Sequence, residues 1–505
     1  MRIPIFYSAL LLTGVDLLLR LVATFFQVYL SGRIGAAGIG LLQLVMSVSM
    51  LARTAGIAGV RTASMYLTAE ERGRGRRGTA RWILSGCFLY SLVCSGAVSL
   101  GLYFGAPFLA QHWIGNVDTV EALRLFASFL PVTCLCGVMT GHFTAANQIG
   151  TLTAVEIAEQ LCSMTVTLLA LSLWAGGDPS RACQAVLLGN SGGACLTLLS
   201  LLLVRRRSRE APGPRIPVTR RLLRIAVPLA LADDLKAGLS TAENLMVPRR
   251  LELYGGAEAP LAAFGMVCGM VFPVLMLPAA ILFSLAELLI PELARCAAAG
   301  SRRRIRYLTR RSLRVAMLYG LACGGLLFLL AQPLCQRLYP GSGAGRYLRR
   351  FALLAPMLYC DAITDAMTKG LGQQQFCVRY NIFTSLLDII FLYLLLPQYG
   401  MDGYFLSFLV THMINFLLSI RRLSIAAGVP LRLGPPLRAA VGTLLALWTA
   451  AQFPSPAVQA AAFLILSGCL HCLLGVLARE DLDWVWGMVR PNRRSREAQK
   501  NRPGW

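Results

Sequence analysis

Runs of about twenty apolar residues recur from one end of this chain to the other, and they constrain the fold more than any other feature. Each run is long enough to cross the roughly 30 Å hydrocarbon core of a bilayer as a helix. Only 14% of the 505 residues are charged, whereas soluble proteins carry about 25%. The sequence therefore predicts an all-α polytopic membrane protein with about fourteen transmembrane helices.

The Arg-rich loops predict how these spans are oriented. The spans lie near residues 6–30, 38–66, 82–106, 123–147, 153–175, 182–204, 224–249, 261–290, 312–336, 348–370, 381–397, 403–420, 438–453 and 457–478. If the amino terminus is cytoplasmic, the basic stretches 70–81, 205–224, 295–311 and 421–438 all fall inside, with the tail from Arg479. Both termini are therefore expected in the cytoplasm. Arg249, Arg250 and the segment 337–350 would lie at the outer face, and we interpret them as interfacial or functional exceptions.

The formal charge of +24 would indicate nucleic acid as a partner of a soluble chain. Here the positive-inside rule accounts for the charge, so no nucleic acid is expected. The fifteen cysteines show no framework or zinc-site spacing, and they predict neither disulfides nor a metal.

The linker 205–223 divides the chain, because its three prolines cannot continue a helix. We predict a six-helix lobe over 1–204, a second over 224–422, an extra helix pair over 423–478 and a basic tail over 479–505. The lobes resemble each other at an offset of 220 residues, where the turn 34–37 corresponds to 254–257. The sequence thus predicts two pseudo-symmetric lobes plus two C-terminal helices, an arrangement typical of transporters with a site between repeats.

Charged residues inside the first two spans are the main functional candidates. Asp16 and Arg20 lie in the first span, and Arg53 and Arg61 in the second. A charge at membrane depth costs about 2.5–3.5 kcal/mol on insertion scales, so it is expected to face protein or a water-filled cavity. For each residue a buried structural pair or snorkelling to an interface is the alternative, whereas the group together favours a polar central path.

The seventh span adds a second polar set, which a lipid-facing helix could not hold. Its members are Asp233, Asp234, Lys236, Glu243 and Asn244. One interpretation is that Asp233 and Lys236, three residues apart, neutralise each other on one helix face. The other is that the set forms the wall of a cavity and couples a cation.

Two stretches resemble a known family. Residues 247–294, with a PRRL turn, a Gly-Met segment and a Pro-rich helix, and residues 20–57, with their Gly-Ala-x-Gly-Ile-Gly-Leu-x-Gln turn, resemble the stage V sporulation protein B-like family. That family belongs to the multidrug/oligosaccharidyl-lipid/polysaccharide exporter (MOP) superfamily. The resemblance implies a flippase that moves a lipid-linked oligosaccharide or peptidoglycan-type precursor across the plasma membrane by alternating access, in sporulation or in cell-wall or polysaccharide biogenesis.

By likeness to the lipid II flippases, Arg20 falls on an essential arginine of the first helix and Arg53 on one of the second. Gln27 stands near the position where those relatives carry another arginine. The hypothesis is that Arg20, Arg53 and Arg61 receive the pyrophosphate. Asp16 and the polar set of the seventh span would balance the empty site or couple Na+, H+ or the membrane potential.

Two other functions stay open. One is a cation-coupled multidrug exporter of the same superfamily, and the other is a non-transporting membrane scaffold for wall synthesis. No nucleophile–base set, phosphate loop or metal-ligand spacing is found, so neither an enzyme nor a bound cofactor is expected. The expected partners are the lipid-linked saccharide and membrane lipids, and the protein is expected to be a monomer.

Overall fold

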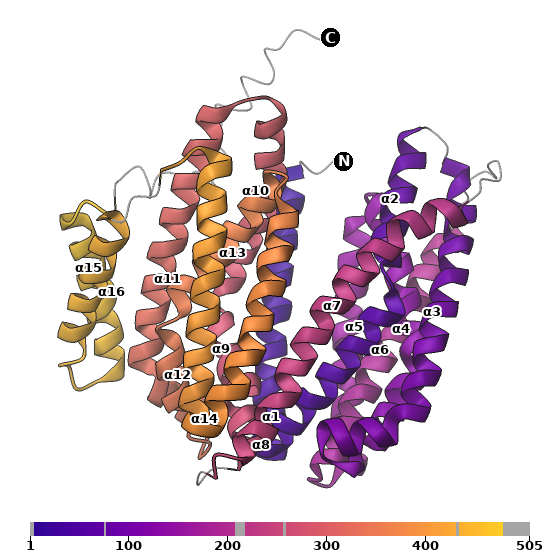
Figure 1. The fold of residues 1–505 in the computed structure, drawn as a ribbon, viewed down its shortest axis with the longest axis horizontal. Helices are drawn as coiled ribbons and strands as arrows, with labels where there is room; N and C mark the ends of the chain where they lie inside the picture. Colours follow the sequence, from indigo (N-terminus) through magenta and orange to yellow (C-terminus); the bar gives the residue numbers. More distant parts are fainter. Residues whose placement is uncertain (1–4, 75–76, 208–217, 256–258, 431–433, 478–505) are drawn as a thin grey trace. The chain divides into compact units, whose positions relative to one another are not determined.

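The computed structural model describes residues 5–74, 77–207, 218–255, 259–430 and 434–477, and within these ranges the chain is helical and has no β-strand (Figure 1). The helices are α1 (Ile5–Ile57), α2 (Val60–Gly73), α3 (Ala80–Leu109), α4 (Val120–Ala145), α5 (Ile149–Ala170), α6 (Pro179–Arg207), α7 (Thr219–Glu252), α8 (Pro260–Phe264), α9 (Phe272–Met276), α10 (Ala279–Ala298), α11 (Arg302–Leu338), α12 (Ala344–Ala352), α13 (Ala355–Gly370), α14 (Gln374–Ala427), α15 (Gly434–Ala450) and α16 (Pro456–Leu473). A π-helical segment, η5 (Gly265–Val271), joins α8 to α9. The expected all-α class is confirmed.

Two helices are long enough for two crossings each. α1 has 53 residues and α14 has 54, which is about 80 Å at 1.5 Å per residue and more than twice the hydrocarbon core. α1 is interrupted at Gly35 (φ 69°) and α14 at Gly400 (φ 57°), in a left-handed conformation that favours glycine. Gly255, which the predicted repeat matches to Gly35, has nearly the same φ of 66°.

The described helices coincide with the fourteen expected spans. By length and apolarity, eight helices of the described residues could cross a membrane, or nine if Pro260–Met276 and Ala279–Ala298 form one interrupted span. This count treats α1 and α14 as one span each, and it omits α7, the α12–α13 segment and α15. α7 is omitted because it is rich in polar residues, and α15 because it has only 17 residues. The membrane-spanning class and the number of spans are therefore confirmed.

The chain divides into two compact units. Unit 1 consists of residues 1–277, 338–344 and 382–411, and unit 2 of residues 278–337, 345–381 and 412–505. The lobes predicted from the sequence, 1–204 and 224–422, remain a prediction, as do the other domain bounds. Residues 208–217 of the predicted linker, and the predicted tail with the last residue of the helix pair, lie outside the described residues.

Close backbone contacts hold the helices of unit 1 together. A Cβ atom on Gly40 in α1 would lie 2.1 Å from the carbonyl oxygen of Leu261 in α8, and one on Gly265 in η5 would lie 2.1 Å from the carbonyl oxygen of Ala36. Only glycine fits at either place. Small residues that let helix backbones approach are the usual basis of helix packing in lipid. The first half of η5 is thus fixed against α1.

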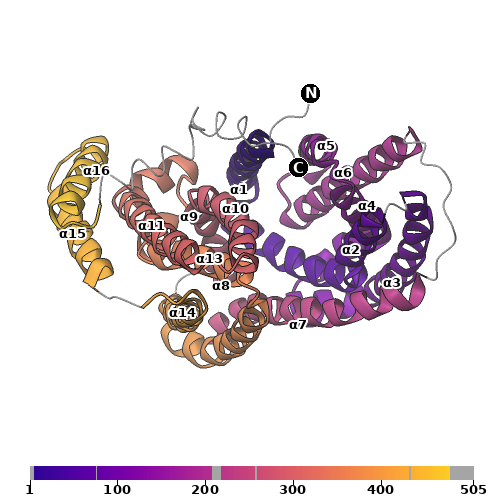
Figure 2. The same cartoon turned by 90° about the horizontal axis from the view of Figure 1, so that it is seen from above.

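Unit 2 uses the same device. A Cβ on Gly320 in α11 would lie 2.7 Å from Cα of Pro356 in α13, and one on Gly325 would lie 2.1 Å from the ring of Phe463 in α16. Phe463 is fully buried with Ala446 and Ala450 of α15, so the pair α15–α16 is attached to α11 through this ring. The two helices of the pair run side by side in both views (Figures 1 and 2).

Candidate functional site

Arg20 and Asp16 lie on the first half of α1. The side chain of Asp16 lies outside the described residues, so its predicted role is untested. Arg20 is exposed, and its carbonyl oxygen accepts a hydrogen bond of 2.9 Å from Thr24 Oγ1. Arg20 therefore lies in regular helix with an exposed side chain.

Arg53 and Arg61 lie on either side of a break between α1 and α2. Ala58 and Gly59 both have positive φ (44° and 69°), and the Tyr90 hydroxyl donates a 3.2 Å hydrogen bond to the Ala58 carbonyl. At Gly59 a Cβ would lie 2.4 Å from a backbone carbonyl oxygen of α7, which explains why glycine stands there. The sequence placed both arginines in one span but did not predict this break.

The guanidinium of Arg53 is not balanced by a described carboxylate. Arg53 is half-buried in an apolar helix, and none of the described carboxylates lies within ion-pair distance of it. The same holds for Arg61, which is exposed. A cation in a membrane segment needs an anion or water. This geometry fits a site that receives a negatively charged group.

Among the described contacts, the first residues of the polar set on α7 do not form the internal ion pair that one of the two interpretations predicted. Asp233 and Lys236 are both exposed, and no ion pair joins them in the part of the chain that the structure describes. Asp234 is half-buried beside Asp233 and near Tyr90. The interpretation of Asp233 and Lys236 as a structural pair therefore gains no support from a described contact, and their role stays a prediction.

Further along α7, Glu243 faces a second carboxylate from α14. Glu243 interacts electrostatically with Asp388 and accepts a hydrogen bond from Ser385, while its Oε1 is buried without a partner among the described residues. Asp388 accepts bonds from Ser407 (2.6 Å) and Thr411 (3.1 Å). These groups all belong to unit 1.

This acidic centre, Glu243 with Asp388, was only half visible in the sequence. Glu243 and Asp388 are each a charge in an apolar span, but the sequence does not show that two residues 145 positions apart meet. The sequence signal for a hydrogen-bonded carboxylate nearby is a pair of hydroxyl residues, Ser407 and Thr411, which lie four apart on one helix face. Carboxylate and hydroxyl oxygens can hold a proton or a hard cation. Among the described residues, no three His, Cys, Asp or Glu side chains form a metal cluster.

Asn244, the next residue, connects α7 to α1. Its Nδ2 donates a 3.0 Å bond to Ser47 Oγ, and Thr241 Oγ1 donates a 3.1 Å bond to the Ser47 carbonyl. Interhelical polar bonds of this kind contribute about 0.6 kcal/mol on average in membranes. Asn244 thus links the helix that carries Arg53 to the one that carries Glu243.

A groove runs beside this link, between α1, α7 and α14. It has a volume of about 630 Å³, its lining includes the apolar Leu51 and Leu245, and Arg249 and Arg250 also line it. The Arg250 guanidinium lies over the ring of Tyr393, 3.3 Å from its centre. Two of the arginines that disagree with the positive-inside pattern therefore line a groove with both apolar and cationic walls.

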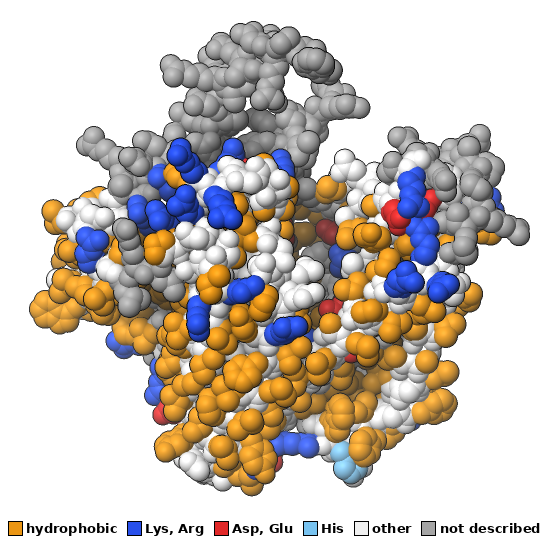
Figure 3. Space-filling view, turned by 45° about the horizontal axis from the view of Figure 1, so that its top comes forward, with side chains coloured by type: hydrophobic (Ala, Val, Ile, Leu, Met, Phe, Trp, Pro, Cys, Tyr) orange, Lys and Arg blue, Asp and Glu red, His pale blue; other side chains and the backbone are white. Residues whose placement is uncertain are grey.

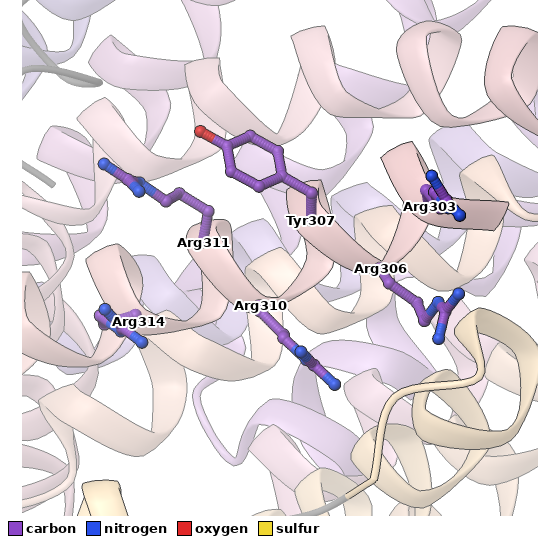
Figure 4. A pocket seen from close by; sticks show the side chains of 6 residues that line it. All are labelled: Arg303, Arg306, Tyr307, Arg310, Arg311 and Arg314. Atoms are coloured by element: carbon purple, nitrogen blue, oxygen red, sulfur yellow. The ribbon is translucent and has the colours of Figure 1, made fainter. Parts of the chain in front are cut away.

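The remaining arginines gather mainly at one end of the helices in each unit (Figure 3). The densest group in unit 2 lies on α11, where Arg303, Arg306, Arg310 and Arg314 follow one another at helical spacing. Figure 4 shows that these side chains all project from a single helix. This stripe forms a charged surface rather than a pocket between helices.

Comparison with known proteins supports a transporter fold. Residues 6–236 match the polysaccharide biosynthesis protein family. Stage V sporulation protein B of Bacillus subtilis (strain 168) is 21% identical over 423 residues, which cover 81% of each chain. A structure of the lipid II flippase MurJ in an inward closed conformation has a TM-score of 0.69 at 12% identity, covering 92% of this chain and 98% of its own. An inward-facing multidrug resistance MATE family transporter of the MOP superfamily has a TM-score of 0.62 at 15% identity, covering 82% of this chain and 100% of its own.

Proposed function

We propose that this protein is a flippase for a lipid-linked oligosaccharide or peptidoglycan-type precursor. Two findings support this: residues 6–236 match the polysaccharide biosynthesis protein family, and the fold is that of the MOP-superfamily transporters. Its role would lie in sporulation or in cell-wall or polysaccharide biogenesis, as the name of the Bacillus subtilis relative suggests. It would be a monomer in the plasma membrane, with both termini cytoplasmic. It would be neither an enzyme nor a nucleic-acid-binding protein.

The observation that carries the proposal is the half-buried Arg53, which has no carboxylate within ion-pair distance among the described residues. A lipid pyrophosphate has chains that prefer the membrane and a head that does not. Guanidinium groups offer forked donors that match phosphate oxygens. Arg53, with Arg20 and Arg61, would receive the pyrophosphate and compensate its loss of water. The apolar and cationic groove beside α7 would suit the same amphiphile.

Coupling would come from the acidic residues. Glu243 and Asp388 would bind Na+ or H+, and Asp233, Asp234 and Lys236 would line the polar path. Asp16 would balance Arg20 when the site is empty. A negatively charged substrate would also respond to the membrane potential. No resident cofactor is required.

The test is a flipping assay in liposomes with a lipid-linked pyrophosphate saccharide. We expect both Arg20→Ala and Arg53→Ala to reduce transport, and Arg124→Ala, on a guanidinium that lies over Tyr103, to leave it intact. Full transport by both the Arg20→Ala and the Arg53→Ala variant would reject the proposed role of the arginines. The lipid-linked intermediate that accumulates in cells lacking the protein would identify the substrate.

A cation-coupled multidrug exporter is the second candidate, and the Glu243–Asp388 pair favours it. Such a protein needs a carboxylate-centred pocket for cationic drugs. Drug resistance on expression, lost in Glu243→Gln but kept in Arg53→Ala, would favour this function over the flippase.

A further inference from the structure

The first turns of α11 present a continuous cationic surface that the proposed function does not use. We call its four arginines at helical spacing, Arg303, Arg306, Arg310 and Arg314, the arginine stripe. With about 100° between successive residues of a helix, these four positions lie within about 80° of one another, on one face. They line a groove of about 340 Å³, and none of its described lining residues comes from another helix (Figure 4). A molecule in this groove would lie directly against α11.

Most of the stripe has no ionic partner in the protein. Arg303, Arg306 and Arg310 are exposed, and no hydrogen bond or ion pair joins them to another of the described residues. The carboxylate of Glu292 in α10 reaches this end of α11, but it pairs with Arg304 at 2.6 Å. The three guanidinium groups therefore keep their donors available to a molecule from outside.

The placement of these charges does not help α11 to fold. Arg306 and Arg310 are four residues apart, as are Arg310 and Arg314, and like charges at this spacing repel each other. The amino end of a helix also disfavours cations, and the first turn of α11 contains no acidic residue. The positive-inside rule accounts for basic residues in a loop, but not for their continuation along one helix face for about three turns. An anion bound along the stripe would offset both unfavourable effects.

The apolar part of α11 begins where the stripe ends. Residues 315–338 extend over about 36 Å at 1.5 Å per residue, which is enough to cross the hydrocarbon core without the stripe. Only 28% of the apolar window of this helix is buried inside the protein, so acyl chains can pack along it. Tyr307, beside the stripe, is exposed, and tyrosine is common at the depth of lipid headgroups. The stripe therefore falls in the headgroup layer.

We propose that the arginine stripe binds the headgroup phosphate of an anionic phospholipid from the adjoining leaflet. Guanidinium groups offer forked donors that match phosphate oxygens, and basic residues directly beside a transmembrane segment attract anionic lipids. A soluble phosphate compound would meet the same donors, but it would gain nothing from the apolar continuation of α11. The structure therefore favours a lipid as the occupant. This inference does not depend on the proposed transport function.

The test is native mass spectrometry of the full-length protein in non-ionic detergent, with phosphatidylglycerol and phosphatidylcholine as probes. We expect the wild type to prefer phosphatidylglycerol. The triple variant Arg303→Gln, Arg306→Gln and Arg310→Gln should bind it about tenfold or more weakly, because three charge-assisted contacts are lost, and should bind phosphatidylcholine as before. Its melting temperature without added lipid should be equal or higher, since the repulsion within the stripe is relieved.

A matched control removes the same charge from unit 1. Its three substitutions are Arg206→Gln, Arg220→Gln and Arg224→Gln, all at exposed positions. We expect this control to bind phosphatidylglycerol within about twofold of the wild type. A further variant with lysine at the three stripe positions keeps the charge but loses the forked donors, so it should bind between the wild type and the glutamine variant.

Stabilisation gives a second measurement. Added phosphatidylglycerol should raise the melting temperature of the wild type and the control more than that of the glutamine variant. The proposal is overturned if the wild type binds the two lipids equally, or if the glutamine variant binds phosphatidylglycerol like the control. It is also overturned if glycerol phosphate displaces phosphatidylglycerol at equal concentration, because the stripe would then be a site for a soluble phosphate compound.

Discussion

Replacing Arg53 with glutamine should change stability and transport in opposite directions. Arg53 is a half-buried cation with no carboxylate within ion-pair distance among the described residues. A cation at the centre of a membrane helix costs about 2.5–3.5 kcal/mol. Half-burial reduces this to roughly 1–1.5 kcal/mol, so Arg53→Gln should raise the melting temperature by about 1–3 °C.

If Arg53 receives the pyrophosphate, as proposed, the same change should impair transport, because a forked donor is lost. A hydrogen bond to a charged group contributes about 1.5–3 kcal/mol, so the transport rate at low substrate should fall about 10- to 100-fold. The two measurements are a thermal melt in detergent and the liposome flipping assay, with Arg124→Gln as the matched control. A variant that is less stable yet transports normally would refute the reasoning, since Arg53 would then be a structural residue.

Three other changes test the remaining groups. Glu243→Gln should remove the dependence of transport on a Na+ or H+ gradient, measured in liposomes with and without the gradient, while basal binding of substrate persists. Gly40→Ala should destabilise the protein by about 1–3 kcal/mol, because its methyl group would lie 2.1 Å from a backbone carbonyl oxygen of α8. Gly96→Ala, where no atom lies within 4 Å, should be neutral or stabilising in the same melt. In a double-mutant cycle, Asn244→Ala and Ser47→Ala should show a coupling energy of about 0.5–1.5 kcal/mol, and a value near zero would remove the proposed link between α7 and α1.

Local features of the fold were predictable because the bilayer imposes them. The length of each apolar run determined the spans, and glycine at 35 and 400 marked the places where one long helix becomes two crossings. The contacts between helices were not predictable, because a helical pattern defines a face but not its neighbour. Thus Glu243 and Asp388 are each visible in the sequence as an unusual charge, whereas their proximity appeared only in the structure. For Asp233 and Lys236 the spacing makes a pair geometrically available, and both side chains are exposed, so the pairing stays a prediction.

Helix α7 contacts both the helix that carries Arg53 and the helix that carries Asp388, so it can connect a basic residue with an acidic one. In its centre, bonds from Thr241 and Asn244 to Ser47 hold α7 against the helix that carries Arg53. One residue before Asn244, Glu243 interacts with Asp388 of α14, so α7 contacts a basic and an acidic element within one helical turn. Neutralising Glu243 would weaken its repulsion from Asp388 and let α14 approach α7. The prolines at 228 and 248 lie on both sides of this fixed centre, where a helix lacks backbone hydrogen bonds and bends most readily. On the proposed mechanism, cation binding at Glu243 would therefore affect Arg53 through α7. This helix is held by hydrogen bonds at its centre and can bend at the proline on either side.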